Sequence, residues 1–394
     1  MQSLQELYRI GFGPSSSHTI GVGLGAMSFA KQFPQADEFS VVLYGSLADT
    51  GIGHGTDRVL RETLAPKKVE ITFDHKNKNI KHANTFCITA FKLGKELKKE
   101  FFYSLGGGAI RNESGSIRPV SLYNLSTFDG IKKWCISNNK RVCEFVFETE
   151  DVKEFLQTVW TQMKQTIENG LNAEGELPGG LRVNREAKEL YMNAHKIQGN
   201  YENSVVSAYA FACAEENAGG GRIVTAPTCG ACGVLPAVLK WAQETHEYSD
   251  DQMVEALATA GIVGNLIKTN ASISGAECGC QAEIGTACCM AAAGYAELLG
   301  YDTVIIERAA EIAMEHFLGL TCDPISGLVQ IPCIERNAIA ARRAIDAVRL
   351  AVSVSDKRKI SFDLVVDIMY ETGIAIHDNF RETSKGGLAK LYSA

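Results

Sequence analysis

The 394-residue sequence contains no long block of lysine or arginine, and its net charge is −7, with 46 acidic against 39 basic residues. Such a chain has no basic patch to attract phosphate backbones or anionic lipid. No uninterrupted apolar run reaches the roughly 18 residues of a membrane span. The first residues, Met1–Glu6, have neither the basic nor the apolar part of an export signal. We therefore expect a soluble, cytoplasmic protein that binds neither nucleic acid nor membrane.

Cysteine is scarce in the first half of the chain. Of the 12 cysteines, only Cys87, Cys135 and Cys143 precede residue 200. Without an export signal, these thiols indicate a reducing compartment, where cysteines fill cores, act in redox chemistry or bind metals rather than form disulfides. Their concentration in the second half directs the search for a metal site to that half.

The N-terminal part of the chain is predicted to form a small α+β domain. The proportions of apolar (45%) and charged (22%) residues are ordinary for a globular protein, and the length allows two domains. Strand-like runs alternate with helical segments over the first ~125 residues. The predicted strands are 39–44, 69–73, 84–90 and 101–105.

The second part of the chain is predicted to be mostly helical. An amphipathic helix is predicted from Val152 to Trp160, and after Pro178 alanine-rich segments follow with 3.6-residue periodicity. Ser249 and Gln252 form a capping box, and Ser361 begins another helix that Gly373 can stop. The segment 282–299 is apolar nearly all round, so it should be the buried central helix. We place the domain boundary near residue 150, giving an α+β domain at 1–150 and a mostly all-α catalytic domain at 151–394.

The strongest candidate site is the loop from Cys322 to Cys333, taken together with Cys280. Two prolines and a glycine prevent a continuous helix in this loop, so both of its thiolates can turn to one side. Cys280 lies just before another helix start, so three soft ligands can meet. Three cysteines around an iron–sulfur cluster would leave one iron open as a Lewis acid.

Two further segments could bind a ligand. Gly11–Thr19 is a Gly/Pro turn that places serines at a helix N-terminus, which suits an anion such as a carboxylate. Simple N-capping would need only one of these serines. His54 lies among four glycines between residues 45 and 55, which leaves its ring accessible, although a lone histidine is more often structural.

Five motifs resemble the iron–sulfur-dependent L-serine dehydratases in their single-chain form, and they occur in that family's order over nearly the whole length. They are 13–19 (GPSSSHT), 177–181 (LPGGL), 225–228 (TAPT), 270–277 (NASISGAE) and 322–333. The resemblance implies a β-type domain followed by an α-type domain, and an L-serine ammonia-lyase that releases pyruvate and ammonia. It also implies a [4Fe–4S] cluster held by Cys280, Cys322 and Cys333.

The sequence departs from that family pattern in two places. The tail 386–394 keeps the Gly-Gly-Leu-Ala motif but lacks the terminal cysteine that can cover the open iron. Cys229 and Cys232 form a CxxC pair, which could be half of a zinc site completed by Cys278 and Cys280, or a redox pair. We interpret them as two buried thiols, because a zinc ion there would remove Cys280 from the cluster; a position near the cluster is the alternative.

Dehydration of serine requires removal of an unacidic α-proton and departure of hydroxide. No lysine motif typical of pyridoxal phosphate enzymes is found, so an open iron would assist the hydroxyl group. His54 is the first candidate for the general base and His18 the second. The candidate substrate-binding residues are Ser16, Ser17 and Thr19 for the carboxylate, and Lys268, Asn270, Ser272 and Ser274 for the rest of the ligand. The site would then form between the two domains.

Other functions share these features. A slightly different pocket would favour L-threonine or L-cysteine, because one methyl group changes binding by only ~1–3 kcal/mol. A sensor that binds an amino acid beside a cluster or zinc would use the same cysteines without turnover. The metal could also be purely structural. A homodimer is expected from base rates alone.

Overall fold

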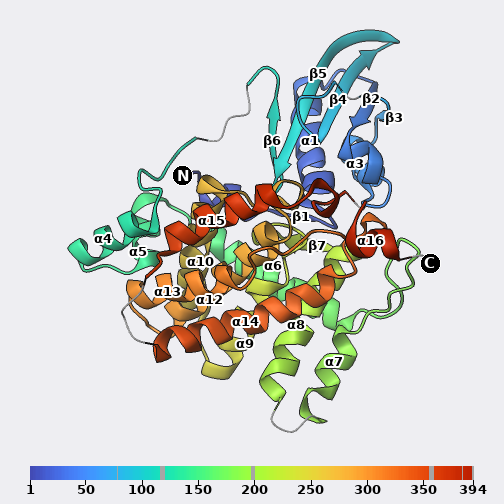
Figure 1. Ribbon diagram of the computed structural model, residues 1–394. Helices are drawn as coiled ribbons and strands as arrows, with labels where there is room; N and C mark the ends of the chain where they lie inside the picture. The colour runs from blue at the N-terminus through green and yellow to red at the C-terminus, as the bar shows by residue number, and fades with distance from the viewer. Residues whose placement is uncertain (78, 116–119, 197–199, 355–358, 384, 393–394) are drawn as a thin grey trace.

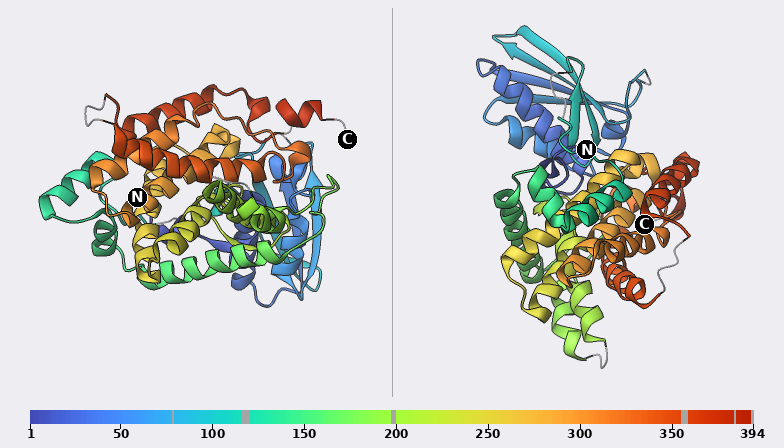
Figure 2. Two further views of the ribbon diagram at one scale, coloured as in Figure 1. Left: turned by 90° about the horizontal axis from the view of Figure 1, so that it is seen from below. Right: turned by 90° about the vertical axis from the view of Figure 1, so that its left-hand side faces the viewer.

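The computed structural model describes residues 1–394 except 78, 116–119, 197–199, 355–358, 384 and 393–394. A small mixed sheet with helices lies at one end of the molecule, and a larger helical body forms the rest (Figure 1). Figure 2 shows the same division from two other sides. The predicted fold class, an α+β part followed by a mostly helical part, is confirmed. The boundary near residue 150 stays a prediction.

The sheet has five strands in the order β3-β2-β4-β5-β6. Only the β2–β3 pair is parallel. The strands are β2 (Glu38–Tyr44), β3 (Lys68–Asp74), β4 (Thr85–Lys92), β5 (Lys95–Gly106) and β6 (Ala109–Asn112). All four predicted strands are therefore present. Helices α1 (Gly21–Gln32), α2 (Ser46–Thr50) and α3 (Thr56–Leu64) accompany the sheet, whose separate apolar core includes Phe29, Phe39 and Phe102.

The helical body is built around α12 (Thr286–Leu298), every residue of which is buried. This helix packs against four others in the body: α9 (Val234–His246), α10 (Asp250–Asn270), α13 (Thr303–Glu315) and α14 (Cys333–Ser353). The remaining helices are α4 (Phe128–Asn138), α5 (Val142–Thr149), α6 (Lys153–Asn172), α7 (Ala187–Asn193), α8 (Tyr201–Ala218), α11 (Gly275–Cys278), α15 (Phe362–Ala375) and α16 (Gly387–Leu391). The predicted central helix is confirmed, because a near-continuous apolar surface can only be satisfied by burial on all sides.

The two predicted N-caps form, but Gly373 does not end its helix: α15 continues to Ala375, and Gly373 packs closely against Cys278 from inside it. The Ser249 hydroxyl accepts from the Gln252 amide, and the Gln252 side chain accepts from the Ser249 amide, so α10 begins with a capping box. Ser361 accepts from the Leu364 amide at the start of α15. Within the described part of the chain, none of the helices combines the length and the apolar character needed to cross a bilayer.

The first twenty residues join the two parts of the molecule. Strand β1 (Ile10–Phe12) pairs antiparallel with β7 (Arg222–Val224), far along the chain. Leu4, Leu7 and Tyr8 belong to the large core of the helical body rather than to the core of the sheet. The chain therefore starts in the helical body and then enters α1 and the sheet, which places the turn at residues 13–17 where the two parts meet.

Candidate active site

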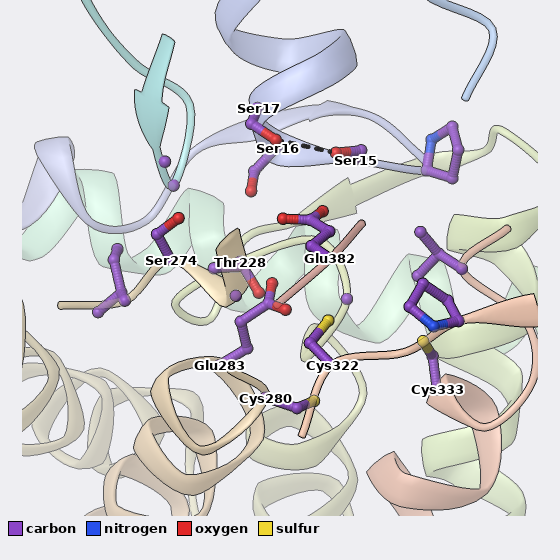
Figure 3. A pocket seen from close by; sticks show the side chains of 18 of the residues that line it. Ser15, Ser16, Ser17, Thr228, Ser274, Cys280, Glu283, Cys322, Cys333 and Glu382 are labelled. Carbon is purple, nitrogen blue, oxygen red and sulfur yellow. Dashed lines mark hydrogen bonds between the residues drawn. The ribbon is translucent and has the colours of Figure 1, made fainter. Parts of the chain in front are cut away.

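A cavity lies where the sheet part meets the helical body. From the N-terminal half it is lined by the turn 14–17, His54 and the glycines 106–107. The helical half contributes Thr228, 273–275, Cys280, Glu283, Cys322, Cys333 and Glu382, among others. Figure 3 shows the serine side chains and the cysteine side chains on opposite sides of this space. The structure thus brings together residues that lie more than 300 positions apart in the sequence.

The serine turn enters the cavity at the start of a helix. Ser15 is the N-cap of the π-helical turn η2 (Ser16–Ile20), which continues directly into α1, and its hydroxyl accepts from the His18 amide at 3.2 Å. Ser16 and Ser17 line the cavity. Thr19 does not, because its hydroxyl donates to the backbone carbonyl of Phe12 at 3.0 Å. Ser15 serves as the cap, and the Ser17 hydroxyl contacts His18 Nδ1 at 2.9 Å, so the hydroxyl of Ser16 is the one most readily available to a ligand.

His54 presents a free nitrogen to the cavity. Its Nδ1 lies 3.0 Å from the carbonyl oxygen of Thr50. A carbonyl only accepts, so Nδ1 carries the proton and Nε2 holds the lone pair in the neutral ring. His54 is 2% exposed, and its Nε2 has no hydrogen-bond partner among the described residues. The neutral ring therefore keeps a lone pair that is not used within the described part of the protein.

His18 lies behind His54 rather than in the cavity lining. The two ring centroids are 4.4 Å apart. Both nitrogens of His18 are engaged: Nδ1 lies 2.9 Å from the Ser17 hydroxyl, and Nε2 lies 2.9 Å from the Thr50 hydroxyl. His18 therefore holds the serine turn and α2 beside the His54 ring, while His54 faces the ligand space.

Burial lowers the pKa of His54 to about 4, with the Thr50 carbonyl opposing the shift. Burial, followed by the neighbouring His54, lowers the pKa of His18 well below its usual value. Both rings are therefore neutral at neutral pH. Between pH 6.5 and 4 the unfolded chain binds protons that the folded chain does not, so these groups stabilise the fold fully above pH 6.5 and lose that contribution as pH falls.

This shift predicts an acid sensitivity that a variant can isolate. Between pH 7.5 and pH 5, His54 should account for a loss of about 2 kcal/mol in the free energy of unfolding. We expect the loss measured by urea unfolding to be smaller by that amount in His54→Gln, which cannot be protonated in this range. Equal losses in wild type and variant would contradict a neutral, buried His54.

The three predicted cysteines line the cavity from separate segments. Cys280 precedes the turn η4 (Gln281–Gly285), Cys322 precedes the turn η5 (Ile325–Gly327), and Cys333 begins α14. A hydrogen bond with Cys322 lowers the pKa of the Cys280 thiol against the effect of burial. Gly275 leaves room beside them, since a Cβ there would lie 3.2 Å from the Cys322 sulfur.

These donors fit a cluster better than a single ion. Among the described residues, no three histidine, cysteine or acidic side chains converge as one metal ion requires. A cluster takes each thiolate at a different iron atom, so the sulfurs need only face a common space. Cys229 and Cys232 are buried thiols away from the cavity lining, and the Cys232 sulfur contacts the Cys213 carbonyl at 3.6 Å.

The remaining predicted residues are placed differently. Ser274 lines the cavity, where it lies next to the glycine turn at 106–107. Lys268 donates to the Glu6 carbonyl at 2.8 Å, and burial lowers its pKa to about 8. Asn270 donates to the carbonyl of Ser126, and Ser272 donates to the Glu277 carboxylate. None of these last three residues lines the cavity.

Two carboxylates in the cavity were not predicted from the sequence. Burial raises the pKa of Glu283, and burial, followed by the neighbouring Glu283 and Cys280, raises the pKa of Glu382 to about 8. Glu283 could have been identified from the sequence as a site residue, because it is an isolated acid at the start of an otherwise apolar helix and three residues after Cys280. Glu382 could not have been identified in this way, since no motif surrounds it.

Comparison with known proteins agrees with this geometry. The family model described as serine dehydratase alpha chain matches residues 62–389, and the one described as serine dehydratase beta chain matches residues 3–67. The chain belongs to the serine dehydratase family. It is 40% identical to the L-serine dehydratase of Haemophilus influenzae, with 99% of each chain covered. It is also 39% identical to L-serine dehydratase TdcG of Escherichia coli, with 99% of each chain covered, and 38% identical to the L-serine dehydratase of Streptomyces coelicolor, with 98% of each covered.

The two matched regions cover almost the whole chain in β-then-α order. Most of the cavity-lining residues, from Gly106 to Glu382, fall in the alpha-chain match, whereas the serine turn and His54 fall in the beta-chain match. The cavity therefore joins both family regions.

Proposed function

We propose that this chain is an L-serine ammonia-lyase that converts L-serine to pyruvate and ammonia with a [4Fe–4S] cluster. The proposal is supported by full-length similarity to proteins named L-serine dehydratase. The observation that carries it is the cavity itself, which is lined both by His54, whose Nε2 has no hydrogen-bond partner among the described residues, and by three cysteines. Cys280, Cys322 and Cys333 would hold the cluster, which when bound would supply an open iron as a Lewis acid for the substrate hydroxyl.

The protein's own residues account for binding and proton removal. The hydroxyls of Ser16 and Ser17, at the positive end of a helix, would hold the substrate carboxylate. His54 Nε2 would accept the α-proton, because it alone of the two histidine rings reaches the cavity. Loss of that proton and of hydroxide gives 2-aminoacrylate, whose imine tautomer reacts with water to give pyruvate and ammonia. Only the loss of the α-proton and the loss of hydroxide need the enzyme.

Purified protein handled without oxygen should be brown and should release pyruvate from L-serine. We expect exposure to air or an iron chelator to remove both the colour and the turnover, because an iron without a protein ligand is open to solvent species. Pyruvate would be measured with a coupled dehydrogenase, and the cluster by its visible absorption. Turnover that survives air and chelation unchanged would contradict the proposal, and colour without pyruvate release would indicate a sensor instead.

A further inference from the structure

Two acidic side chains enter the cavity between the serines and the cysteines. Glu283 and Glu382 both line it, and Figure 3 shows their carboxylates in the space between Ser16 and Cys322. Among the described residues that line the cavity there is no lysine or arginine. Arg336 lies outside the lining, where it donates to the Thr321 carbonyl at 2.7 Å and is in hydrogen-bond contact with Cys280. The titratable groups of the lining are therefore His54, the two glutamates and the thiols.

The backbone holds Glu382 in an unusual conformation. Its φ is 58°, in the left-handed region that residues other than glycine seldom adopt. Two hydrogen bonds fix it there: the Cys322 amide donates to the Phe380 carbonyl at 2.7 Å, and the Glu382 amide donates to the Cys322 carbonyl at 2.8 Å. The segment is thus paired to the cysteine loop, and the fold directs this carboxylate into the cavity at a conformational cost.

The cavity lining also includes a buried polar atom without a hydrogen-bond partner in the described part of the chain. His54 Nε2 is buried and has no hydrogen-bond partner among the described residues, and His54 lines the same space as the glutamates. The Thr228 hydroxyl, in contrast, is in hydrogen-bond contact with the Glu283 carboxylate. Buried polar groups in native proteins are almost always paired, so the unpaired nitrogen of His54 points to a bound polar molecule. A free amino acid has one negative and one positive end, and its positive end needs an acidic partner.

We propose that Glu382, supported by Glu283, binds the α-ammonium group of the amino acid substrate. This assignment rests on the proposed function and adds a specificity determinant to it. With the carboxylate at Ser16 and Ser17 and the ammonium at Glu382, the substrate is held at two points on its α-carbon. A third point, the hydroxyl group, would then determine which hydrogen faces His54. A hydroxy acid that lacks the amine cannot make the contact with Glu382 and should bind more weakly than the amino acid.

Two unreactive ligands test this assignment directly. L-Alanine has the ammonium and carboxylate but no hydroxyl group to lose, and 3-hydroxypropanoate has the carboxylate and hydroxyl but no ammonium. We expect Glu382→Gln to weaken L-alanine binding by about tenfold or more and to leave 3-hydroxypropanoate binding within about twofold, as measured by calorimetry. In steady-state assays KM for L-serine should rise about tenfold, while kcat changes less than about threefold.

Matched variants distinguish a charge effect from a structural one. Glu382→Asp keeps the charge and should recover most of the L-alanine affinity. Glu277→Gln removes an exposed carboxylate from α11, while its amide oxygen can still accept from Ser272, so it should behave as wild type. Thermal melting of each variant verifies folding.

Two results would overturn the assignment. Equal weakening of both ligands would mean that Glu382 only shapes the cavity. Unchanged L-alanine binding together with a changed electron paramagnetic resonance spectrum would mean that Glu382 acts on the cluster. Because the binding measurements do not require turnover, they remain informative even where wild-type protein releases no pyruvate from L-serine, which is the result that contradicts the proposed function instead.

Discussion

Replacing His54 with glutamine is expected to lower kcat for L-serine by about 10²–10⁴-fold, the usual contribution of a general base. Glutamine can fill much of the same space and can still donate to the Thr50 carbonyl, but it has no lone pair basic enough to accept an α-proton. Since His54 acts on the transition state, kcat and kcat/KM should fall together. Initial rates of pyruvate formation under anaerobic conditions give both values.

A matched control is available in the same half of the chain. His75 lies on the surface, where its Nδ1 is 3.0 Å from an Asp49 carboxylate oxygen. His75→Gln should therefore retain wild-type kcat. The assignment of His54 as the general base would be contradicted if the His54→Gln variant kept more than half of the wild-type activity with its cluster intact.

Replacing Cys322 with serine should abolish both the visible absorption and the turnover. Serine is a poor ligand for iron at neutral pH, and Cys322 is the middle member of the set, in hydrogen-bond contact with Cys280. The fold should persist, because the loop is held by backbone bonds to Phe380 and Glu382 that do not involve the sulfur. Circular dichroism and iron content would be measured on the same preparation.

Cys288 provides the control for this experiment. It is a fully buried thiol on α12 that donates to the Ala340 carbonyl at 3.3 Å, a bond that a serine hydroxyl can also make. Cys288→Ser should keep its colour and activity. If Cys322→Ser unfolded the protein, the metal would be structural. If it kept full iron content and activity, the assigned ligand set would be wrong.

Much of the framework could be predicted from local pattern. The four predicted strands and the central helix follow from hydrophobic periodicity, which depends only on neighbouring residues. The capping box at Ser249 has an equally local cause. His54 and the three cysteines were identified because glycine-rich loops and spaced thiols are themselves sequence signals, and the structure places all four around one cavity.

The remainder depends on contacts between distant segments. Lys268 lies just before the motif that contains Ser274, yet its ammonium group donates to the Glu6 carbonyl, and nothing near residue 268 in the sequence indicates this partner. Glu382 enters the cavity only because its backbone pairs with Cys322 in a left-handed conformation. Side-chain direction at such positions is set by tertiary pairing, which a linear pattern does not encode.

The pairing of β1 with β7 has a consequence for synthesis on the ribosome. Residues 10–12 are translated early, but their partner strand, 222–224, emerges some two hundred residues later. The sheet, with its own core, can fold as soon as it leaves the exit tunnel, whereas the preceding segment must wait. A nascent chain therefore carries a folded N-terminal sheet whose serine turn has no anchor, and a truncated product can be well folded in that part while remaining inert.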